Sequence, residues 1–404
     1  MQRPEQVPVG RKIRILVSLQ GKPRKIFKYA SLLSGAAIML SVSAVCGALY
    51  VRSKAQEASA SVQKIVAPSG IDEARYVTVG GVRQWITVRG QDRSQPVLLF
   101  LHGGPGDTVS DMAYAFKRPW EDYFTVVQWD QRGFGRSAID QRKLAGSVTR
   151  DQITSDGIEL SEYLRNRFGQ RKIFIMGHSW GSLVGLEIAH RRPDLLHALV
   201  TTGQVVAWED GWAERRKLLM EEARQMGDID TFAQMERLGP PPRSGEFDEL
   251  RDWILQIPVR ETGHSWHSDD GSSLAFPMMA LFSPTAEISD MAALLLPDAT
   301  YETNMRDVFR SARGWTAQGS VGSELKVPWI VMQGSHDWQT PTHMARNYFD
   351  RVCAPWKKWI EFRNSAHQVP LEEPGRTMAA LVGDVLPAKD GRRAAESETC
   401  PVKP

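Results

Sequence analysis

Three residues of this 404-residue chain combine the side chains needed to cleave a carbonyl compound. Ser179, Asp337 and His367 each follow a short apolar run, in that order along the chain. A histidine can take the proton of a serine hydroxyl, while a carboxylate on the other ring nitrogen fixes the histidine tautomer and stabilises the imidazolium. Together these residue types predict a serine hydrolase that forms an acyl-enzyme, which water then resolves.

Ser179 is the middle residue of the pentapeptide 177–181, which has the pattern G-x-S-x-G. The apolar run 173–176 precedes this pentapeptide and a helical pattern over 183–189 follows it, so we expect a strand, a sharp turn and a helix. The two glycines let the strand and the helix approach closely, and the turn raises the serine hydroxyl above the sheet edge. The amide of Trp180 then lies at a helix N-terminus, where it can hold an oxyanion.

A second oxyanion donor is expected from the loop 102–106, with the sequence HGGPG, which follows another apolar run. Its glycines expose backbone N–H groups with no side chain in the way. Either Gly103 or Gly104 could supply the donor that complements Trp180, and we favour Gly104. His102 is expected to brace the loop rather than to take part in the reaction.

Asp337 lies in the pattern G-x-x-D-x-x-x-P at the end of a buried-strand pattern. We expect it to accept a hydrogen bond from the catalytic imidazole; its alternative role is to cap the helix that begins near Pro341. His367 lies on the loop after the last expected strand, 359–362, whereas His343 falls in the helix between the last two strands.

Apolar runs alternate with helical patterns along most of the chain. The continuous apolar run 96–101 is expected to form a strand covered on both faces, and 124–129 is expected to form another strand. Residues 149–152 form a capping box that opens a helix. Alternating apolar and polar residues around Gly80-Gly81 predict a hairpin. The fold class is therefore α/β, with a mostly parallel, doubly wound sheet and a front hairpin.

Three motifs in this order, HGGPG, DQRGFGRS and GHSWGS, resemble the proline iminopeptidase branch of the α/β-hydrolases. The resemblance covers about residues 71–203 and 325–387. It implies the α/β-hydrolase fold with an inserted helical cap, and a triad in the order serine, aspartate, histidine. It also implies aminopeptidase-like cleavage of N-terminal residues from a small-molecule or short-peptide substrate, with no organic cofactor.

Two other functions stay open. The first is hydrolysis of small apolar carboxylic esters, because residues 204–313, where the cap is inserted, do not match the branch. The second is an inactive hydrolase scaffold that serves as a binding module.

Recognition of a free N-terminal ammonium requires carboxylates, and the segment between Gln204 and Pro240 has eight acids against five bases. Glu221 and Glu222 lie on its most regular helical stretch. The remaining acids are Glu209, Asp210, Glu214, Asp228, Asp230 and Glu236. An apolar pocket could be lined by Trp208, Trp212, Trp253, Trp266, Met220, Met226, Met235, Met278 and Met279, although packing between cap helices explains such residues equally well. The substrate-binding residues are therefore not assigned.

The N-terminal segment predicts a membrane anchor. Residues 29–51 carry no charge and, as a helix, span about 34 Å, enough to cross a bilayer core. Eight bases and one acid precede them, so the N-terminus is expected in the cytoplasm and the catalytic domain in the periplasm or outside the cell. The alternative is a secreted protein whose signal peptide is cleaved near residues 58–60.

The expected domains follow from these patterns: a basic cytoplasmic segment (1–28), the anchor (29–51), a linker (52–70), the hydrolase core (71–203 and 314–387), the cap (204–313) and a flexible tail (388–404).

Charge and cysteine content exclude several classes of partner and cofactor. Removing residues 1–54 changes the formal net charge from +3 to −6, so the basic balance gives no support for nucleic-acid binding. His264 and His267 form only a weak H-x-x-H signal, and no metal site is expected. Cys353 and Cys400 could pair in an oxidising compartment, although their spacing does not favour it. The oligomeric state is not indicated.

Overall fold

The computed structural model describes residues 23–139, 144–243, 246–257, 275–288, 290 and 298–400, in two compact units, Met1–Ala55 and Gln56–Pro404. His264, His267 and Trp266 lie outside the described residues.

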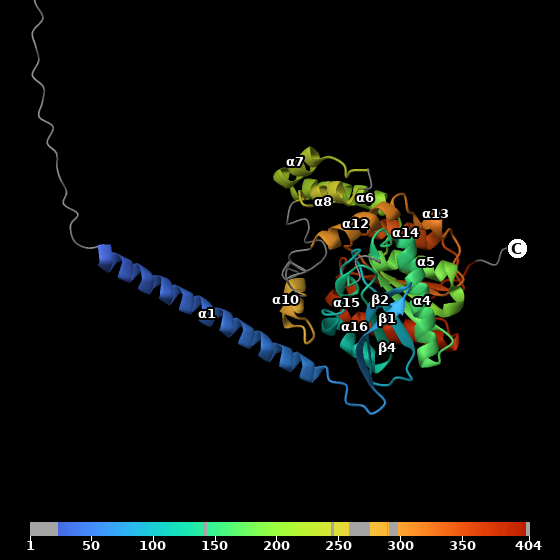
Figure 1. Ribbon diagram of the computed structural model, residues 1–404. Coiled ribbons are helices and arrows are strands. Elements are labelled where there is room, and N and C mark those ends of the chain that lie inside the picture. The colour runs from blue at the N-terminus through green and yellow to red at the C-terminus, as the bar shows by residue number, and fades with distance from the viewer. Residues whose placement is uncertain are drawn as a thin grey trace, which may run out of the picture. The chain divides into compact units, whose positions relative to one another are not determined.

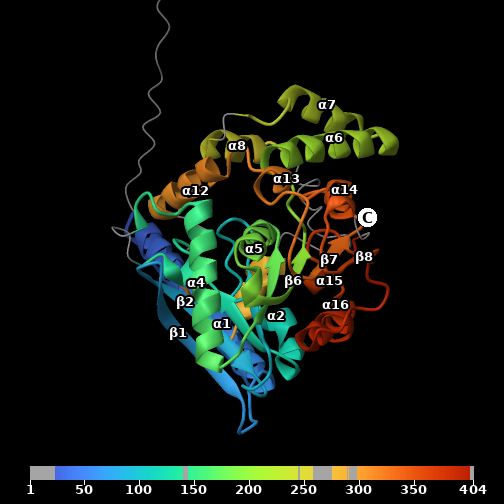
Figure 2. The same ribbon diagram turned by 90° about the vertical axis from the view of Figure 1, so that its right-hand side faces the viewer.

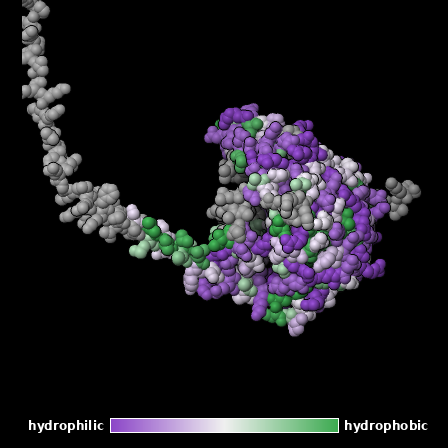
Figure 3. All heavy atoms as spheres, viewed as in Figure 1, coloured by the Kyte–Doolittle hydropathy of each residue, from purple (hydrophilic) through white to green (hydrophobic). Residues whose placement is uncertain are grey.

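Helix α1, Pro23–Val62, begins in the first unit. Among the described residues, α1 is the one helix that is long and apolar enough to cross a membrane, over its stretch Ile38–Val62. Its described apolar side chains, such as Met39 and Leu40, are exposed (Figure 3).

The expected linker over 52–70 is partly wrong, because α1 continues as a helix to Val62. Residues 52–62 contain three alanines as well as arginine, lysine, glutamine and glutamate, all of which have high helix propensity, and the first glycine or proline after them is Pro68. Polar composition alone therefore does not end the helix.

The second unit is built on an eight-stranded sheet in the order β1-β2-β4-β3-β5-β6-β7-β8. Strands β1, β2 and β4 are labelled in Figure 1. The strands are β1 Ile71–Val79, β2 Val82–Gly90, β3 Val97–Leu101, β4 Thr125–Trp129, β5 Ile173–His178, β6 Leu196–Thr202, β7 Trp329–Gly334 and β8 Lys357–Phe362. The pairs β1–β2 and β2–β4 are antiparallel and all other pairs are parallel. The mostly parallel sheet and the hairpin at Gly80-Gly81 are thus confirmed.

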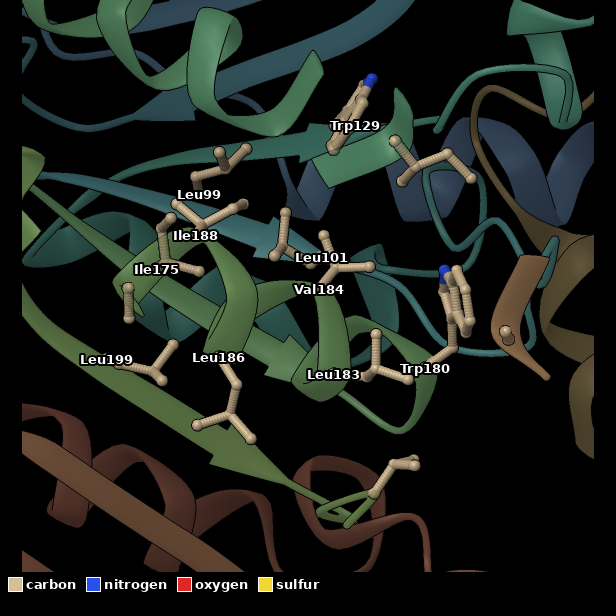
Figure 4. Close-up of a cluster of buried hydrophobic side chains, with 14 of the residues drawn as sticks. Leu99, Leu101, Trp129, Ile175, Trp180, Leu183, Val184, Leu186, Ile188 and Leu199 are labelled. Carbon is tan, nitrogen blue, oxygen red and sulfur yellow. The ribbon is translucent and has the colours of Figure 1, made fainter. Parts of the chain in front are cut away.

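Alternate residues of the central strands pack on opposite faces of the sheet. Leu99 and Ile175 pack with helices α4, Arg150–Phe168, and α5, Trp180–Arg191, on one face (Figure 4). On the other face, Leu98 and Phe174 pack with residues of α2, Tyr114–Lys117, and α16, Pro374–Ala380. Because both faces are covered, strands β3 to β7 are buried along almost their whole length.

Between β6 and β7 the chain forms the inserted helical cap. Its helices are α6 Trp208–Met226, α7 Ile229–Leu238, α8 Phe247–Ile254, α10 Ala275–Phe282 and α12 Ala299–Ala312, followed by the short α13 Ala317–Ser320. Helices α6, α7 and α8 form a layer of their own outside the sheet and its covering helices (Figure 2). Helix α14, Thr342–Arg351, lies between β7 and β8, and the short helix α15, Val369–Glu372, follows β8.

The expected flexible tail over 388–404 is wrong for residues 388–400. Lys357 in β8 and Glu398 exchange two backbone hydrogen bonds of 2.8 Å, and Ala388 and Ala394 are buried. A disulfide joins Cys353 to Cys400. The segment is held by one backbone bridge, small buried side chains and a covalent bond, none of which produces a helical or strand pattern in the sequence.

The disulfide is expected to stabilise the second unit. Cys400→Ser should lower the free energy of unfolding by about 2–4 kcal/mol, because the bond restricts the unfolded chain over a separation of 47 residues. The matched control is Cys46→Ser, which removes an exposed free cysteine. Urea unfolding of the full chain in detergent, with and without reductant, measures the difference. Equal midpoints for Cys400→Ser and Cys46→Ser would contradict the expectation.

Candidate active site

Ser179 lies on a tight turn between β5 and α5 with a left-handed backbone, φ 53°. The turn leaves no room for side chains on its flanks. A Cβ on Gly177 would lie 2.2 Å from the carbonyl oxygen of Gly181, and a Cβ on Gly181 would lie 2.1 Å from that of Leu101. The Ser179 amide donates to Thr202 O at 2.9 Å, which ties the turn to β6. The strained serine backbone is thus imposed by packing that only glycines permit.

The structure brings Asp337 and His367 together at the carboxyl ends of β7 and β8. Asp337 Oδ2 lies 2.9 Å from His367 Nδ1, and both side chains are buried. The Asp337 carboxylate also accepts hydrogen bonds from the Gln333 side chain (2.9 Å) and from the amide and hydroxyl of Thr340 (2.9 and 2.7 Å). Helix α14 has Pro341 at its N-cap, so Asp337 does not cap that helix. These four donor groups, from His367, Gln333 and Thr340, hold the Asp337 carboxylate in one orientation against the imidazole.

Two neighbours fix the His367 ring from the other side. Gly203, which follows β6, has φ 57°, and a Cβ there would lie 2.7 Å from His367 Cε1. The His178 ring centroid is 4.7 Å from that of His367. Burial is the largest cause that holds the pKa of His178 well below its usual range, so the His178 ring stays neutral. Gly203 was not identified from the sequence, because a positive φ at a glycine produces no recognisable local sequence motif.

The loop 102–106 packs directly against Ser179. A Cβ on Gly103 would lie 3.1 Å from Ser179 Cβ, and Gly104 has φ 105°. Burial lowers the pKa of His102 to about 4, so its ring is neutral at neutral pH. His102 Nε2 accepts from the Gln131 amide at 3.2 Å, and the other nitrogen, Nδ1, therefore donates to Gly103 O at 2.8 Å. This geometry agrees with the bracing role expected for His102.

Gln131 is a further residue that the sequence analysis did not single out. Its side-chain nitrogen donates to His102 O at 3.2 Å, and its side-chain oxygen accepts from Trp180 Nε1 at 3.0 Å. It therefore connects the loop that carries Gly104 to the first residue of α5. The DQRGFGRS motif, in which Gln131 is the second residue, is the sequence signal that marks this position.

A small cavity of about 80 Å³ opens beside Ser179, between the core and the first cap helix. Gly104 and Ser179 form its floor, and Trp208 and Trp212 of α6 line it from the cap. The other lining residues are Gln204, Val205, Val206, Ala207, Gly211, Gln339, Thr340, Pro341 and Met344. Glu221 and Glu222, the acids favoured for amine recognition, do not line this cavity, because they lie more than two turns further along α6.

In the part of the chain that the structure describes, no group of three or more His, Cys, Asp or Glu residues could hold a metal ion.

Comparisons with known proteins show which proteins this chain resembles. Residues 96–226 match the family described as alpha/beta hydrolase fold. A probable aminopeptidase of Bacillus subtilis is 29% identical over 302 residues, which are 74% of this chain and 92% of that protein. A proline iminopeptidase of Neisseria meningitidis is 38% identical over 106 residues, which are 26% of this chain and 32% of that protein.

Solved structures show the same fold. A membrane phospholipase A from a bacterium superposes with a TM-score of 0.55 at 18% identity, over 90% of this chain and 98% of that one. A proline iminopeptidase-related protein of Thermus thermophilus superposes with a TM-score of 0.54 at 20% identity, over 79% of this chain and 99% of that one.

The contact between Gly203 and His367 makes a testable prediction. Gly203→Ala should lower kcat/KM about a hundredfold, because the new Cβ must displace the imidazole. Gly227→Ala is the matched control, since Gly227 also has positive φ but its Cβ would meet nothing within 4 Å. Both variants should lose about 1 kcal/mol of stability from backbone strain, measured by urea unfolding. Equal kcat/KM in the two variants would show that the imidazole does not depend on Gly203.

Proposed function

We propose that this chain, which has the α/β-hydrolase fold and is similar to a probable aminopeptidase and to proline iminopeptidases, is a serine hydrolase that releases N-terminal residues from short peptides. The observation that carries the proposal is the buried pair of Asp337 and His367, 2.9 Å apart, at the same sheet edge as the strained Ser179. Similarity to the probable aminopeptidase over most of both chains supports the peptidase activity.

In the proposed mechanism, His367 takes the proton of Ser179 and the serine oxygen attacks the substrate carbonyl carbon. Asp337 accepts from His367 Nδ1–H, which fixes the tautomer and stabilises the imidazolium that forms. The backbone amides of Gly104 and Trp180 hold the oxyanion of the tetrahedral intermediate. His367 then protonates the leaving amine, and a water molecule activated by the same histidine hydrolyses the acyl-enzyme.

Hydrolysis of small apolar carboxylic esters is the second candidate. The cavity beside Ser179 is lined from the cap by two tryptophans, Trp208 and Trp212, and Met344 lies on another wall. Such a wall suits a short apolar acyl group whether the leaving group is an amine or an alcohol. The two functions share one mechanism and differ in whether the substrate carries a free ammonium.

We also propose that α1 anchors the catalytic domain to a membrane, with residues 1–28 in the cytoplasm and the domain in the periplasm or outside the cell. Eight bases precede the uncharged run 29–51. The disulfide between Cys353 and Cys400 supports an oxidising compartment. Secretion after signal cleavage is the alternative, and it gives the domain the same compartment without the anchor.

The triad assignment predicts a specific order of losses. Ser179→Ala and His367→Ala should each lower kcat about a million-fold, because the nucleophile and base act as one unit, and Asp337→Asn about ten-thousandfold. Turnover of alanine and proline anilides and of a short acyl ester measures all three variants, with circular dichroism to verify folding. Wild-type kcat in folded His367→Ala would refute the assignment. A fluorophosphonate probe that fails to label the wild type at Ser179 would instead favour an inactive scaffold.

The proposed topology predicts the behaviour of fusions to the C-terminus. Alkaline phosphatase fused after Pro404 should be active in intact cells, because it folds only in an oxidising compartment. A fusion after residue 28, which precedes the uncharged run, is the matched control and should be inactive. An inactive alkaline phosphatase fusion after Pro404, together with activity at the same position of a reporter that works only in the cytoplasm, would refute the topology. A mature N-terminus near residue 61 would replace the anchor with a cleaved signal.

A further inference from the structure

We infer that Asp107 is a specificity-determining residue of this site and receives the α-ammonium of the substrate. The inference rests on the proposed aminopeptidase function and names the group that would recognise its substrate class. Asp107 directly follows the HGGPG loop and was not among the acids considered for amine recognition.

The Asp107 carboxyl group lies against the proposed oxyanion donor. The Asp107 amide donates to Gly103 O at 3.2 Å, which turns the chain back over the loop. The Asp107 carboxyl carbon is 3.2 Å from the position that a Cβ on Gly104 would take. Gly104 and Ser179 both line the cavity. The carboxylate is therefore held at the edge of the site by the same backbone that forms the cavity floor.

Nearby acids are already engaged, but Asp107 is not. Asp111 pairs with Arg136 and accepts from the Thr285 hydroxyl. Asp130 accepts from the Ser110 hydroxyl at 2.7 Å and from the Arg136 amide at 2.9 Å. Among the described residues, the Asp107 carboxylate has no hydrogen bond or ion pair, and the residue is exposed to solvent.

The protein around Asp107 makes an unpaired charge unfavourable. Although much of the residue's surface is open to solvent, protein surrounds its carboxyl group, and this desolvation raises the carboxyl pKa to about 6, while the nearby charge of His367 lowers it. On the cap side, Tyr301 of α12 faces it, and the pKa of that phenol is raised by burial and then by Asp107, so the phenol carries no charge at neutral pH. An ionised carboxylate between His367 and a neutral phenol is a favourable partner for an incoming cation.

The reach of a substrate amine matches this position. In an aminoacyl group the α-nitrogen is about 2.5 Å from the carbonyl carbon that Ser179 would attack. When the carbonyl oxygen binds the Gly104 amide, the α-ammonium is within about one hydrogen bond of a carboxylate packed on the same glycine. Glu209, in the first turn of α6, has one buried oxygen without a hydrogen-bond partner among the described residues. Neither Asp107 nor Glu209 lines the cavity itself, but the Asp107 carboxyl group packs on Gly104, which does line it.

The test compares substrates that have the amine with substrates that lack it. Full-length wild type, Asp107→Asn and Glu209→Gln are assayed in detergent with alanine and proline anilides and with a p-nitrophenyl acyl ester. Inhibition of ester hydrolysis by L-prolinamide and by its N-acetyl derivative measures amine binding without anilide turnover. Glu209→Gln is the matched control, because it also removes one negative charge near the site.

Asp107→Asn is expected to lower kcat/KM for the anilides at least tenfold, mainly through KM, and to weaken prolinamide inhibition by a similar factor. Ester turnover should stay within twofold of wild type, and Glu209→Gln should change neither activity selectively. In wild type, the ratio of anilide to ester kcat/KM should fall below about pH 6, where Asp107 becomes protonated. Taking the ratio cancels the pH dependence of the catalytic steps that the two substrates share.

Three results would overturn the inference while leaving the proposed function intact. Asp107→Asn could leave kcat/KM for the anilides unchanged, or lower kcat/KM equally for the anilides and the ester. Alternatively, Glu209→Gln rather than Asp107→Asn could lower kcat/KM selectively for the anilides. Equal losses would mean that Asp107 acts through His367 or the loop. If wild type hydrolyses the ester but neither cleaves anilides nor binds prolinamide, the aminopeptidase function fails and the inference fails with it.

Discussion

The close approach of β3, β5 and α5 is the constraint on which the candidate site depends. Gly181 contacts the carbonyl of Leu101, the last residue of β3, so closely that any side chain there would overlap it. The HGGPG loop begins at the next residue, His102. The same contact that forces the serine into a left-handed turn therefore also sets the separation between the nucleophile and the loop that carries Gly104. The proposed nucleophile and the proposed oxyanion donors are positioned by one packing arrangement.

A strained backbone of this kind costs about 1–3 kcal/mol and persists only where its surroundings are rigid. Residues 180–189 of α5 are all buried, and Leu183 and Val184 pack on the sheet beneath the turn (Figure 4). The hydrogen bonds from Trp180 through Gln131 to His102 add a polar connection above the same helix end. Apolar burial offsets the strain, and the polar connection fixes the direction of the loop.

The sequence predicts those features that local patterns encode. The strands, the hairpin, the turn at Ser179 and the order of the three candidate residues all follow from runs of a few residues, and the parallel sheet then brings the strand ends to one edge. Gln131 and Gly203 were missed because their roles arise from contacts between distant segments. The ordered segment 388–400 was missed for the same reason, since its bridge to Lys357 involves backbone atoms that carry no sequence signature.

The cavity is lined by two different parts of the molecule. The core supplies the residues proposed for the reaction, and the cap helix α6 supplies the wall that would contact the substrate. Gly203, which limits His367, and Trp208, which lines the cavity, are five residues apart, so the first cap helix is tied closely to the sheet edge. The apolar wall can change with α6 without moving the nucleophile, whereas groups on the HGGPG loop cannot move without displacing Gly104. Charge on that loop is therefore positioned as accurately as the oxyanion donor itself. Discrimination between an ester and an aminoacyl amide needs such accuracy, because the two substrates differ near the carbonyl by a single ammonium group.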